Sequence, residues 1–144
     1  MQLESGIAGG PLLLRHVRRG VAGAGDDIAL AAVLLADQFG VLGFERLPKP
    51  PGKPPAYEKG GMPTIYLYTP EDGRPATWGN GTHVAFVAET KDAVHRFHDA
   101  VLRLGGSCEG KPGPRPHYGD NYYAAYVRDP DGNKLQAVCY VEGD

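Results

Sequence analysis

His83 lies in a predicted strand, where its imidazole could bind a metal ion or a small molecule. It lies in residues 82–87, Thr-His-Val-Ala-Phe-Val, whose alternation around β-branched and aromatic residues predicts a half-buried strand. Strands aim their side chains rigidly, so His83 could face a cavity and bind a metal ion or a small molecule. The strand pattern taken alone favours another interpretation, a core histidine with a hydrogen-bond partner.

Two other patterns could indicate a metal or nucleotide site, but neither is complete. His95 and His98 form an HxxH pair on a predicted helix, but zinc needs further ligands and none is obvious in the sequence. Residues 20–25 contain glycines without GxGxxG spacing, and no Lys-Ser/Thr follows them, so they do not predict a nucleotide loop.

Bulk composition limits the class of protein. The chain has 144 residues, 42% of them hydrophobic, which suits one domain or two very small ones with a real core. The net charge is −2 and the tight basic cluster is confined to Arg15, Arg18 and Arg19, so nucleic acid is not an expected partner. Cys108 and Cys139 lie far apart without CxxC spacing, as expected for reduced thiols in a cytoplasmic protein.

Membrane and export signals are also absent from the pattern. No segment approaches the roughly 20 apolar residues that a membrane span requires, so no membrane partner is expected. Residues 1–10 lack a basic region followed by an apolar run, and no secretory signal is predicted there.

The second half of the chain predicts a strand, a helix and three further strands. Thr90 can cap the helix, Val94, Phe97, Val101 and Leu104 recur at helical spacing, and two glycines then end it. Residues 129–133, Asp-Pro-Asp-Gly-Asn, predict a hairpin turn in which the carboxylates serve the turn. The expected strands are residues 82–87, 107–110, 122–127 and 135–141, with a Pro/Gly-rich loop at 111–116.

The first half has the same order with weaker signals. A helix is expected from Asp26 or Asp27 to about Phe39. The expected strands are residues 12–21, 42–47, 57–59 and 64–68, with a proline-rich loop at 48–55. The prediction is therefore an α+β fold, one domain over residues 1–144, in which modules 11–70 and 81–142 are joined by a linker at 71–80. The two βαβββ modules would pair into an open, curved mixed sheet with the helices outside.

Several motifs occur in an order and spacing that resemble a known group of proteins. These motifs are Gly79-Asn80-Gly81-Thr82-His83-Val84-Ala85-Phe86, Arg115-Pro116-His117-Tyr118 and Tyr122 to Cys139, so the match covers about residues 78–140. They resemble the glyoxalase/bleomycin resistance/extradiol dioxygenase superfamily, also called vicinal oxygen chelate proteins. Outside that range, Leu42-Gly43-Phe44-Glu45-Arg46 also resembles the end of the family's first helix and its second strand.

This resemblance implies a divalent metal site. In the family, a histidine from the first strand of each module and a carboxylate from the last strand hold the ion, which suits Zn, Fe, Mn, Ni or Co. The matching positions here are His16, His83 and Gln136. Gln136 departs from the family pattern, because an amide is a neutral, weaker ligand and cannot act as a general base. No catalytic residue is therefore assigned, and a site without metal stays open.

The resemblance also suggests residues that border a pocket. Arg115, His117, Tyr118 and Tyr123 lie in or beside a loop that would recognise an oxygen-rich or anionic substrate, and Trp78 would form a wall. The alternative is that Arg115 is solvated, that the tyrosines pack in the sheet and that Trp78 plugs its end. For His16 the alternative is a surface position, and for Gln136 it is a cavity amide that binds His83 or a substrate.

The expected function follows the family and has alternatives. The resemblance implies a glyoxalase-like protein that acts on a small oxygenated metabolite through a metal, as a lyase, isomerase or dioxygenase, commonly as a homodimer. A metal-independent binding protein of the bleomycin-resistance type is the second expectation. A catalytically degenerate scaffold is the third, because residues 1–24 are rich in Gly and Arg where a regular strand is expected.

Overall fold

The computed structural model describes residues 12–15, 38–48, 50–68, 71–72, 74 and 77–141. By its internal contacts the chain divides into two compact units, one of residues 5–77 and one that includes residues 78–144. His16 and most of the helix predicted from Asp26 lie outside the described residues, although residues 38–40 at the end of that helix are helical.

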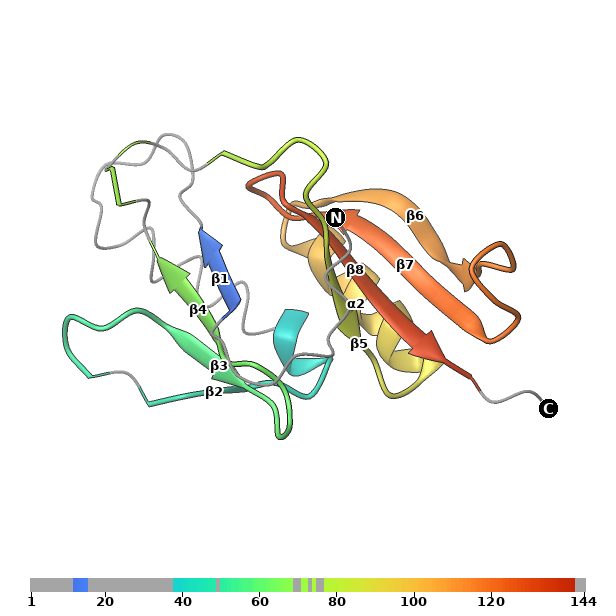
Figure 1. Cartoon of the computed structure of the whole chain (residues 1–144), viewed down its shortest axis with the longest axis horizontal. Helices are drawn as coiled ribbons and strands as arrows, with labels where there is room; N and C mark the ends of the chain where they lie inside the picture. Colours follow the sequence, from blue (N-terminus) through green and yellow to red (C-terminus); the bar gives the residue numbers. More distant parts are fainter. Residues whose placement is uncertain are drawn as a thin grey trace. The chain divides into compact units, whose positions relative to one another are not determined.

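The C-terminal unit has the predicted order of a strand, a helix and three strands (Figure 1). Its sheet has the strand order β5-β8-β7-β6, in which β5 runs parallel to β8 and the other pairs are antiparallel. The central strand β8 carries the continuous buried run from Leu135 to Cys139. The elements are β5 (Val84–Val87), α2 (Lys91–Arg103), β6 (Ser107–Pro114), β7 (Tyr122–Arg128) and β8 (Lys134–Tyr140).

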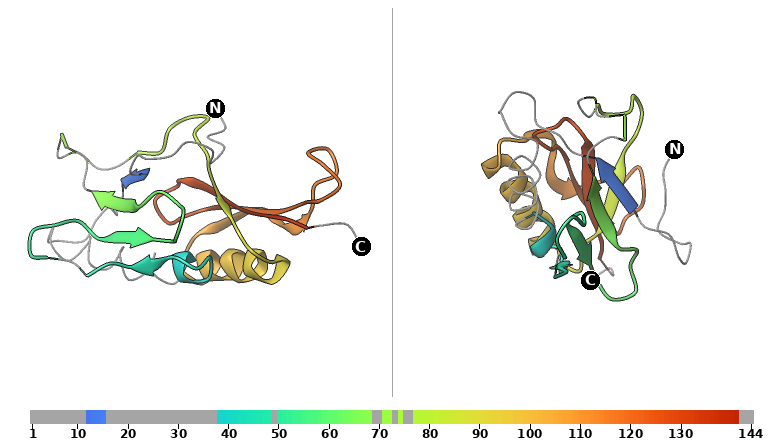
Figure 2. Two further views of the ribbon diagram at one scale, coloured as in Figure 1. Left: turned by 60° about the horizontal axis from the view of Figure 1, so that its bottom comes forward. Right: turned by 90° about the vertical axis from the view of Figure 1, so that its left-hand side faces the viewer.

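Helix α2 covers one face of this sheet (Figure 2). Thr90 caps it as predicted, since its hydroxyl accepts a hydrogen bond of 3.0 Å from the Ala93 N–H. Val94, Phe97 and Val101 are fully buried on the sheet side. Since α2 occupies this face, the residues that alternate to the other face of β7 and β8 are the ones free to build a site.

The turn after α2 packs tightly against the sheet at Gly106. A Cβ at this position would lie 2.4 Å from the Arg128 carbonyl oxygen and 2.5 Å from the Val101 side chain. We therefore expect Gly106→Ala to lower the free energy of unfolding by about 1–3 kcal/mol, measured by urea denaturation. Gly60→Ala is the matched control, because a Cβ there meets nothing within 4 Å. Equal stability of the two variants would contradict this account.

Strand β6 is longer than predicted and includes most of the segment expected to be a loop. Gly113 pairs with Ala124 and Pro114 with Tyr123, after register shifts on either side of Gly110. The prediction of a loop from residue 111 onward was wrong because β6 is an edge strand. A proline at a sheet edge loses no ladder hydrogen bond, and bulges absorb the irregular residues.

Strand β5 begins at Val84, so His83 lies directly before the strand and not within it. The hairpin turn between β7 and β8 forms as predicted around Asp129, which is 3% exposed. Its Oδ1 accepts from the backbone N–H groups of Asp131 and Asn133, and its Oδ2 accepts from the Asn133 side-chain amide. This carboxylate therefore serves the turn.

The N-terminal unit has the same strand order as the C-terminal one. Its sheet runs β1-β4-β3-β2, with β1 parallel to β4 and the remaining pairs antiparallel. Phe39, Tyr57 and Ile65 belong to its core. The equivalent order of strands supports the predicted internal repeat. The strands are β1 (Leu12–Arg15), β2 (Glu45–Arg46), β3 (Ala56–Glu58) and β4 (Ile65–Tyr68).

Two further predictions from composition can be compared with the described residues. Cys108 is exposed and Cys139 is buried, and neither forms a disulfide in the structure. Within the described ranges, no helix is long and apolar enough to cross a membrane.

Candidate functional site

Two neighbouring side chains, His83 and Gln136, carry buried polar atoms without a partner. Gln136 on β8 pairs with Ala85 on β5, two residues after His83, and is 1% exposed. Neither the His83 Nε2 atom nor the Gln136 Oε1 atom has a hydrogen-bond partner in the structure. A buried polar atom without a partner costs about 1–3 kcal/mol, so such atoms mark a place where a ligand can compensate.

The Gln136 amide is held in one orientation by Tyr122 on the adjacent strand. Its Nε2 donates a hydrogen bond of 2.6 Å to the Tyr122 hydroxyl. Because the nitrogen and oxygen of an amide point in different directions, this bond leaves Oε1 available as a lone-pair donor. Tyr122 therefore positions Gln136 for a ligand.

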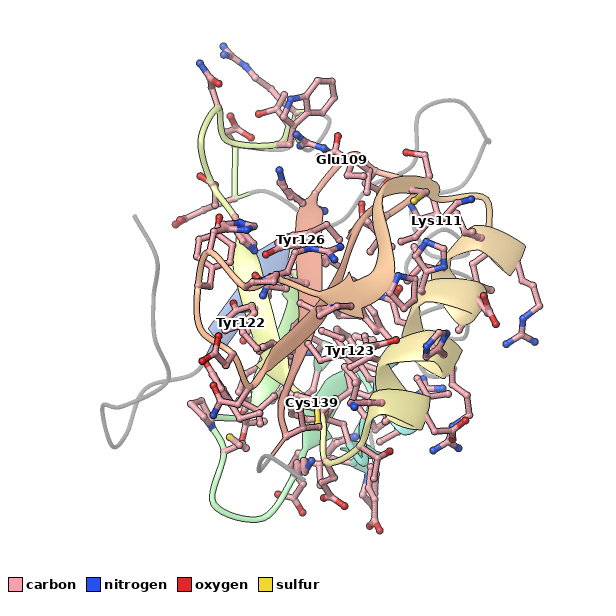
Figure 3. All side chains as sticks on the ribbon, turned by 90° about the vertical axis from the view of Figure 1, so that its right-hand side faces the viewer. Glu109, Lys111, Tyr122, Tyr123, Tyr126 and Cys139 are labelled. Atoms are coloured by element: carbon pink, nitrogen blue, oxygen red, sulfur yellow. The ribbon has the colours of Figure 1, made fainter. Side chains whose placement is uncertain are left out.

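Tyr126 completes the group beside His83. Strand alternation puts Tyr122 and Tyr126 on the face of β7 away from α2, as Figure 3 shows. The rings of His83 and Tyr126 pack edge to face, with their centroids 5.8 Å apart. Burial, with a smaller contribution from Tyr122, raises the pKa of Tyr126 to about 12, so its hydroxyl is a neutral donor at physiological pH.

His83 is kept neutral at physiological pH. Burial lowers the pKa of its imidazole below the ordinary value of 6.5, an interaction of hydrogen-bond type with the Gln136 side chain raises it, and the positive charge of Lys134 lowers it further. The group charges less readily in the folded protein than in the unfolded chain. Its contribution to stability is thus complete above pH 6.5 and decreases as the pH falls below it.

A proton titration tests this environment. We expect the His83 imidazole to titrate with a midpoint below 6.5, measured by NMR from pH 4 to 8, because burial disfavours its charged form. Lys134→Gln should move the midpoint upward. Lys91→Gln is the matched control, since Lys91 lies over Tyr123 on the opposite face of the sheet. A midpoint above 6.5 would contradict the assignment.

Charged groups line the same part of the sheet. Glu109 forms ion pairs of 2.9 Å with Arg128 and 3.2 Å with Lys134. Its hydrogen bond with Arg128, and to a smaller extent the one with Lys134, holds the pKa of the Glu109 carboxyl below its usual range. Lys134 and Arg115 also lie near the Tyr126 ring, at 5.9 and 5.5 Å from its centroid. Of these four charged side chains, three are cationic and one is anionic.

The structure brings some of the predicted pocket residues together. Arg115 lies over Tyr126, which contacts His83. The Tyr118 ring is 5.2 Å from that of Tyr122, and His117 lies against Tyr118 at 4.1 Å, centroid to centroid. Arg115 and Tyr118 are thus connected with the His83–Gln136 pair through the two tyrosines of β7.

Other predicted site residues lie elsewhere. Tyr123 projects from β7 toward α2, where its hydroxyl is 2.7 Å from the His95 Nε2 atom and its ring lies beneath Lys91 (Figure 3). Trp78 is 59% exposed and packs on the β7–β8 turn, where a Cβ at Gly132 would lie 2.8 Å from the indole ring. His16 lies outside the described residues.

The sequence reasoning missed Tyr122, Tyr126 and Lys134. A usable signal was present, because residues i, i+2 and i+4 of a strand share a face. Tyr122 and Tyr126 have the same parity on β7, and Tyr126 is the register partner of Gln136. Tyr123, the residue predicted to bind the substrate, has the opposite parity and therefore faces α2.

The donor set of the described residues fits two positions of a metal site. His83 supplies an imidazole nitrogen and Gln136 an amide oxygen, both buried and without partner. The described part of the chain contains no group of three or more His, Cys, Asp or Glu side chains that could hold a metal ion. His16, the third predicted ligand, lies outside that part.

The family model described as Glyoxalase/Bleomycin resistance protein/Dioxygenase superfamily matches residues 18–137. The chain belongs to this superfamily, as the motifs around His83 and Gln136 indicated, and its two equivalent strand orders agree with that fold. No curated protein sequence matches the chain.

Solved structures show the same fold. A glyoxalase/bleomycin resistance protein from Albidiferax ferrireducens T118 is 29% identical, with a TM-score of 0.71 over 89% of this chain and 94% of that one. A lactoylglutathione lyase from Agrobacterium tumefaciens is 22% identical, with a TM-score of 0.57 over 96% of both chains. A fosfomycin resistance protein from Mesorhizobium loti is 18% identical, with a TM-score of 0.59 over 94% of both.

Proposed function

We propose that this chain is a glyoxalase-like protein that binds a small oxygenated metabolite at a divalent metal held by His83, Gln136 and His16. One observation carries the proposal: the buried Nε2 atom of His83 and the buried Oε1 atom of Gln136 form no hydrogen bond of ordinary geometry, although the two side chains interact closely enough for Gln136 to raise the pKa of His83. Both are lone-pair donors that suit Zn, Fe, Mn, Ni or Co. A metal there would supply Lewis acidity toward two oxygens of a ligand.

The chain's own residues would prepare this site in two ways. Burial and Lys134 keep the His83 imidazole neutral, so its lone pair is available at physiological pH. Tyr122 fixes the Gln136 amide with the oxygen free. The bound metabolite would meet the neutral phenol of Tyr126 as a hydrogen-bond donor.

Metal titration of the chelator-treated protein tests the proposal. We expect stoichiometric binding of at least one of the five metals by calorimetry, and at least a tenfold loss of affinity in His83→Ala, which removes the imidazole ligand. His95→Ala is the matched control, since His95 lies on α2 and contacts Tyr123. Absence of metal binding in the wild type, or full binding in His83→Ala, would overturn the proposal.

A metal-independent binding protein is the second candidate function. It is favoured by the neutral donor set, because Gln136 stands where the family pattern has a carboxylate. In that case the two orphaned atoms would bind the small molecule directly. Ligand binding that survives chelator treatment with unchanged affinity would establish this alternative. Homodimer formation and a cytoplasmic location stay predictions from the resemblance.

A further inference from the structure

Two series of side-chain contacts lead away from the His83–Gln136 pair. The first runs from His83 to the Tyr126 ring and on to the Arg115 guanidinium. The second runs from Gln136 through the Tyr122 hydroxyl to the rings of Tyr118 and Tyr140. The first therefore ends on a cation and the second on exposed aromatic rings, all within residues 78–144.

Arg115 is held in place and its charge is not neutralised by a described carboxylate. Its guanidinium donates to the carbonyl oxygens of Pro114 at 3.0 Å and Lys111 at 2.7 Å. An arginine has five N–H donors, so these two bonds leave others for a ligand. Among the described side chains, Glu109 pairs with Arg128 and Lys134, and none forms an ion pair with Arg115. A fixed guanidinium of this kind favours a planar oxyanion.

The loop that carries these groups is closed by its own hydrogen bonds. The Arg115 N–H donates to the Tyr122 carbonyl at 2.8 Å, and the Tyr118 N–H donates to the Arg115 carbonyl at 2.9 Å. The Tyr122 N–H donates to Gly119 at 3.1 Å. Because the loop is fixed before any ligand arrives, little conformational entropy is lost when one binds.

The second series of contacts exposes aromatic surface. Tyr118 is 56% exposed and Tyr140 is 53% exposed, and both contact Tyr122, with ring centroids 5.2 and 5.4 Å apart. Grouped exposed aromatic rings mark a binding surface more often than scattered ones do. Tyrosines add stacking area at a low cost in side-chain entropy.

We propose that the ligand of this site is a planar aromatic compound bearing a carboxylate or similar oxyanion next to a second oxygen. Its ring lies against Tyr118 and Tyr122, and its anionic group is bound by Arg115. This inference rests on the proposed function, because the second oxygen is the one that would be bound at the site of the His83–Gln136 pair. It also specifies the substrate class that the family fold leaves open.

Three small probes separate the parts of this proposal. Salicylate is planar, anionic and carries adjacent oxygens; catechol lacks the anion; lactate lacks the ring. Each is titrated at low salt into zinc-loaded and into chelator-treated protein, with NMR signals of His83, Tyr118 and Tyr126 as the readout. We expect salicylate to shift these signals and to bind about tenfold or more tightly than either other probe.

Variants then assign the preference to residues. Arg115→Gln should lower salicylate affinity about tenfold and catechol affinity by much less, and the retained catechol binding would show that the loop still folds. Arg115→Lys should retain part of the salicylate affinity, because lysine keeps the positive charge but lacks the paired N–H donors of the guanidinium. Tyr118→Leu should weaken salicylate and catechol alike. Arg96→Gln is the matched control, because Arg96 lies on α2 in an ion pair with Asp92.

The outcomes distinguish this inference from the proposed function. Equal affinity for salicylate and catechol, equal affinity for salicylate and lactate, or no shift with any aryl carboxylate would overturn it, even if metal binds at His83. A salicylate preference without metal binding would support it while the metal part of the proposed function fails. Signals of Tyr118 and Tyr140 that respond to protein concentration and not to probes would make this surface a contact between copies, which also overturns it.

Discussion

Replacing Gln136 with glutamate is expected to raise the affinity for a divalent metal about tenfold or more. The new carboxylate would occupy a position that is 1% exposed, beside the unpartnered Nε2 atom of His83. A charged oxygen interacts with a dication far more strongly than an amide oxygen does in such surroundings. Calorimetric titration with Mn²⁺ and Zn²⁺ measures the change, in which each tenfold step corresponds to about 1.4 kcal/mol.

The same substitution should make the protein depend on its metal. An unpaired buried carboxylate is costly, although the Tyr122 hydroxyl, 2.6 Å from the present amide nitrogen, could donate to it. We therefore expect Gln136→Glu to be less stable than the wild type without metal and to gain more stability when metal is added. A thermal melt with and without metal shows the difference.

A matched variant separates charge from shape. Gln136→Met keeps a flexible side chain of similar volume but removes the amide oxygen, so metal affinity should fall below that of the wild type. Tyr122→Phe frees the Gln136 amide to rotate and should cause a smaller loss. If the Glu and Met variants bind metal as the wild type does, position 136 is not a ligand and the metal part of the proposed function is wrong.

Replacing Asp129 with alanine is expected to lower the free energy of unfolding by about 2–4 kcal/mol. The carboxylate is buried and accepts three hydrogen bonds of 2.9–3.0 Å from Asp131 and Asn133, which close the turn between β7 and β8. Its loss would leave buried N–H donors without an acceptor. Urea denaturation followed by circular dichroism measures the change.

Two comparisons make this second result specific. Asp129→Asn keeps an acceptor oxygen for the two backbone N–H groups and should lose about half as much stability. Asp120→Ala, an exposed acid in the β6–β7 loop, should stay within about 0.5 kcal/mol of the wild type. If Asp129→Ala loses no more stability than Asp120→Ala, the N–H donors of the turn find other acceptors and the carboxylate does not hold the turn.

The C-terminal half shows how far local patterns can predict a fold. Helix α2 was predictable because its cap, its apolar spacing and its terminal glycines all indicate the same helix. The Asp129 turn was predictable because its Pro, Gly and Asn residues strongly favour turns. The extent of β6 was not predictable. Residues 111–114 resemble a loop in isolation, and their pairing depends on β7 accepting an irregular edge strand.

The candidate site shows the same division. The motifs around His83 and Gln136 indicated both residues, and the structure places them side by side with unpartnered atoms. The choice of Tyr123 as a pocket residue did not follow from the register, which puts Tyr126 opposite Gln136 and turns Tyr123 toward His95. A strand alternates with a period of two, so an offset of one residue exchanges the two faces.

The module order and the family could be predicted from the sequence, which also indicated the two side chains at the centre of the candidate site. These predictions depend on local spacing and on short motifs, and both can be read without a structure. In contrast, the folded structure was needed to show that Tyr122 orients Gln136, that Tyr126 lies against His83 and that Arg115 lies over Tyr126. Those contacts join residues from different strands, and their existence depends on register and burial, which arise only when the sheet assembles.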